Sequence, residues 1–270
     1  ALSLNEDLGE TVALAHDLGH SPFGHTGEDA LSDCLNARGL PSFNHNLHTA
    51  KIVTVLEQRY AAYNGLNLCW ETLEGIAKHN GPVHGDLATD MERLFTSFDL
   101  ELHTHASAEA QVAALSDDIA YNTHDVDDGL RAGLLSFDAL RDIALPARAL
   151  REIDADYPDL PADKRAFEVA RRMISELIGD VLSYSRGLLR ELQATSAAQI
   201  RAHRQPVIAF SPTMYDDLQE LRAFLFANLY RHPYVNRRRH KTTKIIKDLF
   251  ELYDARPSLL VSEKGMAEAM

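Results

Sequence analysis

Residues 16–28 read His-Asp-Leu-Gly-His-Ser-Pro-Phe-Gly-His-Thr-Gly-Glu, and they follow directly on an apolar helical pattern. The stretch holds three histidines, an aspartate and a glutamate within 13 positions. Imidazole and carboxylate groups are the usual ligands of a catalytic divalent metal, and histidine is the commonest general acid or base. This density of ligand types at the end of an apolar helix predicts a metal-dependent hydrolase built on helices.

Helical periodicity dominates the rest of the chain, and no segment shows the alternation that several strands would require. We therefore predict an all-α fold. The expected helices cover residues 5–19, 26–39, 45–59, 70–79, 108–121, 162–194, 215–230 and 235–253. Residues 81–105 are poorly periodic and are expected to form a loop with short helical pieces, and residues 204–209 a short extended piece. The histidines near this loop are expected to be mostly surface groups: His79, His84, His103 and His105.

Composition limits the function classes that fit the chain. The 270 residues allow a substantial core, and no apolar run reaches the roughly 18–20 residues that a membrane span needs. A net charge of −13 argues against broad nucleic-acid binding. Cys34 and Cys69 lie far apart in no zinc-binding pattern, so two reduced, buried thiols in a cytoplasmic protein are expected.

The charge is uneven along the chain. A basic cluster runs from Arg231 to Lys247 with no acidic residue until Asp248. Such a cluster on an acidic protein suits a small polyanion such as the phosphates of a nucleotide. A solvated helix face is the plain alternative, and an effector nucleotide or single-stranded nucleic acid is a third possibility.

A second acidic group begins at Asp117-Asp118 and continues through Tyr121, His124 and Asp125. On a helix, positions 117, 121, 124 and 125 fall on adjacent parts of one face. Apolar residues flank them, which indicates that the polar groups approach the core. An ordinary ion pair along the helix is the alternative interpretation.

Several motifs together resemble the HD-domain deoxynucleoside triphosphate triphosphohydrolases. They occur in the order and spacing of that family. The motifs are His16-Asp17, residues 20–25, Asn44-His45-Asn46, residues 65–68, residues 73–82 and residues 117–125, with a looser match at residues 229–232.

The resemblance implies an HD-domain helical bundle with additional C-terminal helices. Residues 1–147 would form the metal-dependent phosphohydrolase core, and residues 148–270 would complete the nucleotide site and the oligomer contacts. The implied reaction hydrolyses a dNTP, with dGTP as the type substrate, to deoxynucleoside and triphosphate. A divalent metal is implied, Mg or Mn first and Ni, Co or Fe as alternatives. A homo-oligomer and a nucleotide effector are implied as well.

The resemblance also implies roles for single residues. The metal ligands would be His16, Asp17 and Asp117. The catalytic groups beside the α-phosphate would be His25, Glu28 and His45. The substrate contacts would be Tyr121, Asp125, Lys78, Tyr230 and Arg231. The family's first metal histidine lies upstream, and no histidine precedes His16 here. Either an earlier part of the domain lies outside this sequence, or the site is incomplete.

Two other functions remain open from the sequence. One is an HD-type phosphohydrolase that acts on another nucleotide or phosphoester. The other is a catalytically impaired, nucleotide-binding regulatory protein. The products released from a dNTP separate the first from the implied reaction, and binding without turnover would indicate the second.

Overall fold

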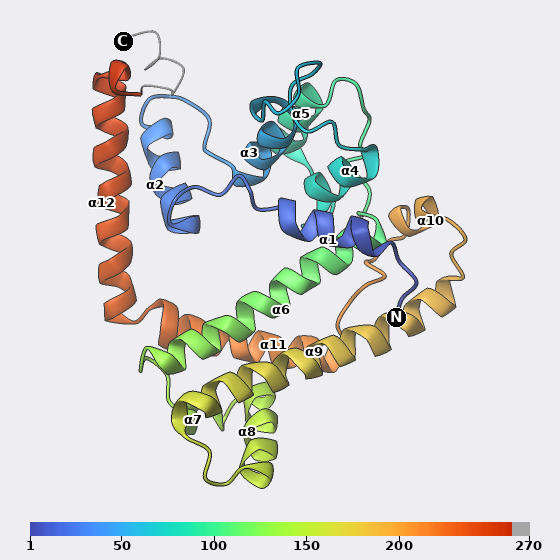
Figure 1. Cartoon of the computed structure of the whole chain (residues 1–270), viewed down its shortest axis with the longest axis vertical. Coiled ribbons are helices and arrows are strands. Elements are labelled where there is room, and N and C mark those ends of the chain that lie inside the picture. The colour runs from blue at the N-terminus through green and yellow to red at the C-terminus, as the bar shows by residue number, and fades with distance from the viewer. Residues whose placement is uncertain (261–270) are drawn as a thin grey trace.

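The computed structural model describes residues 1–260. Within this range the chain is helical, and its only strand-type pairing is an isolated bridge between Gln58 and Gly65. The predicted all-α class is thus confirmed. The α-helices are α1 (Glu6–Ala15), α2 (Gly24–Asn36), α3 (His45–Lys51), α4 (Trp70–Lys78), α5 (Gly85–Leu94), α6 (Ala108–Arg131), α7 (Phe137–Leu140), α8 (Ala144–Asp156), α9 (Ala162–Leu192), α10 (Ala197–Arg201), α11 (Pro212–Leu225) and α12 (Pro233–Ala255) (Figure 1). No helix among the described residues is long and apolar enough to cross a membrane.

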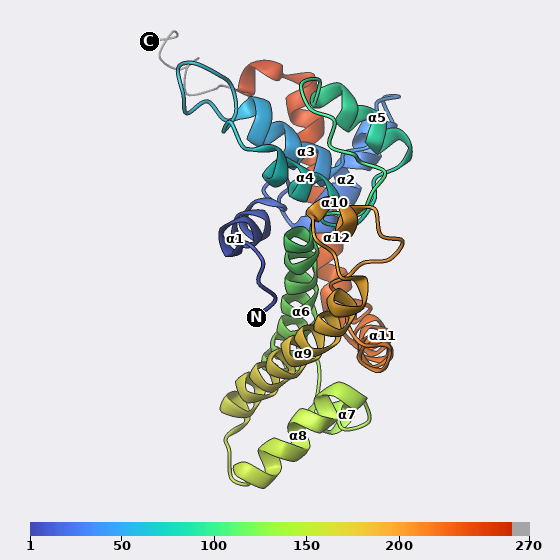
Figure 2. The same ribbon diagram turned by 90° about the vertical axis from the view of Figure 1, so that its right-hand side faces the viewer.

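The helices gather around two main hydrophobic cores that α6 connects (Figures 1 and 2). The first core lies among α3, α4, α5 and the segment after α5, with Val53, Ile76 and Met91 almost fully buried. The second lies among α6, α8, α9 and α11, with Met173 and Leu221 fully buried. Because α6 runs between these cores, it can present residues of its first half to the end of α1.

Helix α6 is longer than the sequence predicts, continuing to Arg131 rather than ending near Tyr121. Its last third is rich in aspartate and contains Gly129, which disfavour a helix interior. Packing overrides that preference. Val126 is fully buried, and a Cβ at Gly129 would lie 2.6 Å from the Leu135 side chain. The glycine therefore allows the following chain to close against the helix.

Other elements also differ from the expected ranges. Helix α3 is short and ends in a π-helical turn, Ile52–Leu56, and α5 forms a regular helix inside the expected loop 81–105. Residues 204–209 contain no helix or strand, and α7 and α8 were not expected. The division at residue 147 falls inside α8, whose Leu150 belongs to the same core as α9. The division itself remains a prediction, and residues 261–270 lie outside the described range.

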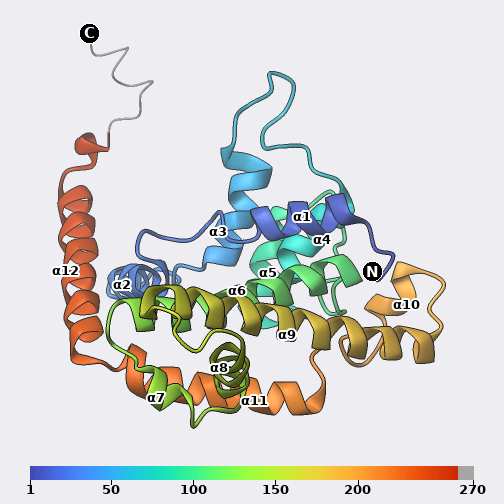
Figure 3. The same cartoon turned by 60° about the horizontal axis from the view of Figure 1, so that its bottom comes forward.

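Helix α12 lies along α2 at one edge of the molecule (Figures 1 and 3). Lys247 pairs with Asp33 at 2.8 Å, and Arg38 pairs with Asp254 at 2.8 Å. Part of the basic cluster therefore serves to join α12 to α2.

The two cysteines differ in their surroundings. Cys34 is buried on α2, but Cys69 is exposed at the start of α4, with its sulfur 3.3 Å from the Thr72 hydroxyl. The expectation of two buried thiols is wrong for Cys69, because this residue precedes the helix rather than lying on its apolar face.

Candidate active site

The stretch 16–28 turns back onto α3 as soon as α1 ends. His16 is the C-terminal cap of α1. The Gly19 N–H donates to the Thr49 hydroxyl at 2.9 Å, and that hydroxyl donates to the His16 carbonyl at 2.9 Å. A Cβ at Gly19 would lie 2.2 Å from the Thr49 nitrogen, so only glycine permits this close approach. The turn brings His20 against His45, the first residue of α3.

His16, Asp17 and Asp117 converge although 100 residues separate the last two. His16 Nε2 lies 3.5 Å from Asp17 Oδ2 and 3.9 Å from Asp117 Oδ1. His16 Nδ1 donates to the Ala13 carbonyl at 2.9 Å, so Nε2 carries the lone pair. Within residues 1–260, this buried Nε2 has no hydrogen-bond partner.

This arrangement fits a divalent cation. A buried nitrogen lone pair without a donor, facing two half-exposed carboxylates, is unfavourable unless a positive charge lies among them. One imidazole and two carboxylates form a donor set that suits Mg, Mn and the later divalent metals alike. The carbonyl bonded to Nδ1 orients the imidazole as the outer ligands of metal sites commonly do.

His79 joins this group, contrary to the expectation of a surface histidine. Its exposed fraction is 7%, and its ring centroid lies 4.8 Å from that of His16. Burial lowers the pKa of His79, and the neighbouring His16 lowers it further. The residue lies in the motif at 73–82, but its spacing from His16 carries no signal that the two meet.

A second group, which we call the histidine cluster, consists of His20, His25, Glu28 and His45. Glu28 accepts hydrogen bonds from the His45 backbone at 3.0 Å, from His45 Nδ1 at 2.9 Å and from His25 Nδ1 at 3.2 Å. The ring of His20 stacks on that of His45 with 4.1 Å between the centroids. Asp17 lies between the two groups, 3.8 Å from His20 Nε2.

The cluster's charges follow from these contacts. Burial alone raises the pKa of the Glu28 carboxyl, but hydrogen bonds from His45 and His25 outweigh it, and the pKa lies below its ordinary value. Burial, together with the nearby His45, lowers the pKa of His20. An ionised Glu28 therefore holds two imidazoles whose remaining ring nitrogens can carry or accept a proton.

The α6 face supplies Tyr121 and Asp125 in addition to Asp117. The Tyr230 hydroxyl donates to the Asp125 carboxylate, and the Tyr121 and Tyr230 rings lie 6.4 Å apart. Burial raises the pKa of Asp125, although the Tyr230 hydrogen bond opposes the change. A cavity of about 570 Å³ extends along His25, His79, Asp117 and Tyr121. The cavity thus borders the group around His16 through His79 and Asp117, the histidine cluster through His25, and the exposed face of α6 through Tyr121.

Lys78, which was expected to contact the substrate, is engaged with other groups of the protein. Its side chain is fully buried and pairs with Glu74 at 2.8 Å, and its ammonium donates to the Glu101 carbonyl and the Thr104 hydroxyl. Burial lowers the pKa of Lys78, while Glu74 opposes the change. The ammonium charge is balanced by Glu74 and ties α4 to residues 101–104, and Lys78 is also one of the residues that line the cavity.

Two arginines bear on the site: Arg231, which was expected to contact the substrate, and Arg222, which was not predicted. The Arg231 guanidinium lies 4.4 Å from the centroid of the Phe226 ring, and Arg231 does not line the cavity. Arg222 on α11 pairs with Asp118, which does line it. No pattern in the sequence singles out Arg222, because it lies outside the basic cluster and reaches Asp118 only through the packing of α11 against α6.

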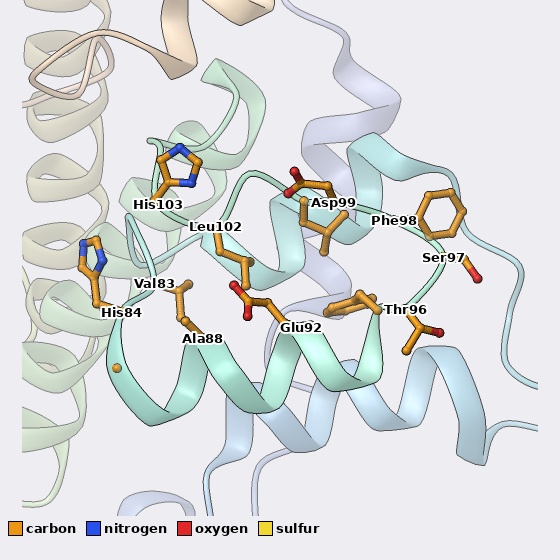
Figure 4. A pocket seen from close by; sticks show the side chains of 13 residues that line it. Val83, His84, Ala88, Glu92, Thr96, Ser97, Phe98, Asp99, Leu102 and His103 are labelled. Carbon is orange, nitrogen blue, oxygen red and sulfur yellow. The ribbon is translucent and has the colours of Figure 1, made fainter.

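A second cavity, of about 660 Å³, lies between α5 and the segment that follows it (Figure 4). Its lining includes His84, Glu92, Asp99 and His103, and none of the predicted site residues. His84 and His103 are exposed, as expected. The cavity is thus separate from the candidate site.

Comparison with known proteins supports the resemblance. The profile of the HD domain matches residues 1–122, and that of the phosphohydrolase-associated domain matches residues 208–268. Proteins named deoxyguanosinetriphosphate triphosphohydrolase-like protein occur among its relatives. The one from Cereibacter sphaeroides is 49% identical over 97% of this chain and 69% of its own length. Those from Jannaschia sp. and Paracoccus denitrificans are 51% and 48% identical, each over 96% of this chain and over 65% and 68% of their own lengths.

The chain therefore spans about two thirds of the length of these relatives. Identity of about half of the residues over nearly the whole chain shows that this chain and these proteins are homologous. Together with the convergence of His16, Asp17 and Asp117, it leads to one conclusion: this chain belongs to the HD-domain phosphohydrolase family of deoxyguanosinetriphosphate triphosphohydrolase-like proteins.

Proposed function

We propose that this chain forms the catalytic part of a metal-dependent hydrolase that converts a dNTP, with dGTP as the type substrate, into deoxynucleoside and triphosphate. The observation that carries the proposal is the buried lone pair of His16 Nε2, which faces Asp17 and Asp117 beside the histidine cluster. Hydrolysis of a phosphate ester needs a cation that neutralises the phosphate charge and a group that transfers protons, and a cation-binding group next to an imidazole–carboxylate pair can supply both.

His16, Asp17 and Asp117 would hold the divalent metal. When bound, the metal supplies charge neutralisation for the phosphate oxygens and lowers the pKa of a bound water. Donor chemistry of this kind suits Mg or Mn and also accepts Ni, Co or Fe. By holding the cation beside the triphosphate, these residues would reduce the electrostatic repulsion between the attacking water and the negatively charged phosphates.

His25, Glu28 and His45 would handle protons and position the α-phosphate. Water adds to the α-phosphorus, the bond from phosphorus to the 5′-oxygen breaks, and that oxygen leaves as the 5′-hydroxyl with a proton. His25 has Nδ1 directed to Glu28, which leaves Nε2 to activate the water or to protonate the 5′-oxygen. The side chain of His25 is 69% exposed, so it is accessible to a substrate in the cavity.

Tyr121 and Asp125 would bind the sugar. The Tyr121 ring is half exposed beside the cavity, and Asp125 is held by Tyr230. A sugar that packs on Tyr121 while its 3′-hydroxyl donates to Asp125 leaves little room for a 2′-hydroxyl, which accounts for a deoxyribose preference. Lys78 lines the cavity and stays a candidate phosphate contact, and Arg222 lies next to the cavity through its pair with Asp118.

Product analysis tests the proposal. The protein is incubated with dGTP and Mn or Mg, and the products are separated by anion-exchange chromatography. Intact triphosphate together with deoxyguanosine supports it. Orthophosphate or pyrophosphate instead would indicate an HD-type phosphohydrolase with another cleavage site, and tight dGTP binding without any product would indicate a regulatory protein.

A further inference from the structure

We propose that His79 supplies a second imidazole to the metal site, so that His16, Asp17, His79 and Asp117 hold the cation together. This inference rests on the proposed function, because it assumes the divalent metal. It adds a ligand from α4 that neither the motifs nor the resemblance assigns.

The distances bring His79 within reach of the same ion as His16. The donor atoms of His16, Asp17 and His79 all lie within 4.8 Å of one another. Two atoms that each lie about 2.0–2.2 Å from one ion are separated by at most roughly 4.4 Å. Small side-chain rotations therefore suffice to place the donor atoms of all three residues around one ion.

His16 and His79 are prepared for ligation in the same way. Each is the C-terminal cap of its helix, α1 for His16 and α4 for His79. Each directs Nδ1 to the carbonyl three residues earlier, at 2.9 Å for Ala13 and 2.8 Å for Ile76. A carbonyl acceptor fixes the proton on Nδ1, which leaves the lone pair on Nε2. Two imidazoles with the same tautomer thus meet edge to face, 4.8 Å apart.

The helix ends favour a cation at this point. The C-terminal end of an α-helix carries a partial negative charge, and a positive ion close to it is stabilised. The C-terminal ends of α1 and α4 bring His16 and His79 together, and both helices lie beside α6, which carries Asp117. The backbone thereby adds to the negative potential of the two carboxylates.

The amide of Asn80 occupies the lone pair that the metal would use. Asn80 Nδ2 donates to His79 Nε2 at 2.9 Å. Asn80 is exposed, so its side chain can rotate away without losing buried contacts. Metal binding would exchange this hydrogen bond for a bond to the ion. Removing the amide by Asn80→Ala should therefore leave Mn²⁺ affinity unchanged or raise it.

The test measures metal binding directly, without reference to hydrolysis. Mn²⁺ affinity is measured by titration calorimetry, and pulsed EPR counts the imidazole nitrogens coupled to Mn²⁺. His79→Gln is compared with the wild type and with His84→Gln, a matched control at an exposed histidine in the other cavity. We expect His79→Gln to weaken Mn²⁺ binding about tenfold to 100-fold and to remove one nitrogen coupling, and His84→Gln to change neither.

Unchanged affinity and unchanged couplings in His79→Gln overturn the assignment. His16→Gln keeps this failure separate from a failure of the proposed function. If His16→Gln weakens binding and His79→Gln does not, only the role of His79 is wrong; if neither does, the metal site itself is wrong. Should His79→Gln fail to fold by circular dichroism, the spectrum of His20→Gln decides, because His20 is the other histidine near Asp17: a single imidazole coupling in that variant overturns the assignment, and two support it.

Discussion

Replacing Glu28 by glutamine tests whether the histidine cluster depends on a negative charge. The carboxylate accepts from the His45 backbone through Oε1, from His45 Nδ1 through both oxygens, and from His25 Nδ1 through Oε2. A glutamine oxygen in the place of Oε1 can keep the backbone bond and one of the two His45 Nδ1 contacts. The amide nitrogen must then face His25 Nδ1 with a second donor, so His25 has to shift its proton to Nε2 or rotate away.

The magnitude follows from the bonds that change. A hydrogen bond to a charged group contributes about 1.5–3 kcal/mol, so the free energy of unfolding should fall by about that amount at pH 7. A positioned acid or base contributes about 10²–10⁴-fold to a rate, so kcat should fall within that range. With the ion bound at His16, Asp17 and Asp117, Mn²⁺ affinity should not change, because Glu28 belongs to the separate histidine cluster.

The pH dependence has a definite sign. The pKa of Glu28 lies below its ordinary value of 4.5, so the carboxylate stabilises the folded state above that pH. This stabilisation is lost as the pH falls through the lower folded-state pKa. The stability difference between the wild type and Glu28→Gln should therefore be largest near neutrality and shrink below about pH 4.5.

The assay combines triphosphate release from dGTP, Mn²⁺ titration and urea unfolding. Glu10→Gln serves as the control, because it removes the same charge from an exposed position on α1. A kcat within threefold of the wild type for Glu28→Gln would refute the role assigned to the carboxylate. A loss of Mn²⁺ binding would instead make Glu28 a metal ligand.

Three further outcomes are expected. His16→Ala should abolish metal-dependent triphosphate release and weaken Mn²⁺ binding, and unchanged turnover would contradict the metal assignment. Lys78→Met should lower the free energy of unfolding by about 3–5 kcal/mol in urea titrations, because it leaves Glu74 buried without its partner; Glu74→Leu combined with Lys78→Met should recover most of the loss. A thiol reagent should modify Cys69 in the folded protein, and Cys34 only after unfolding; native labelling of both would contradict the burial of Cys34.

The sequence predicted those parts of the fold that local interactions control. The first helix was expected to begin at residue 5, and there the Asn5 side chain caps α1 by accepting from the Leu8 N–H at 3.1 Å. The limits of α9 and α12 were predicted to within two residues, because apolar spacing and prolines mark them. The prediction of helix limits was poorer where contacts between segments distant in the sequence determine whether a helix forms. The last third of α6 is helical because Val126 and Gly129 pack against other segments, against the preference of its aspartates.

The sequence alone also determined which residue types the site contains, because His16, Asp17, His25 and Glu28 lie in one short stretch. Their roles remain predictions. Only the tertiary structure decided that Lys78 is buried against Glu74 and that His79 faces His16. The physical reason is the same for both. Burial and the partner of a side chain depend on how α1, α4 and α6 pack, and no spacing along the chain records those contacts.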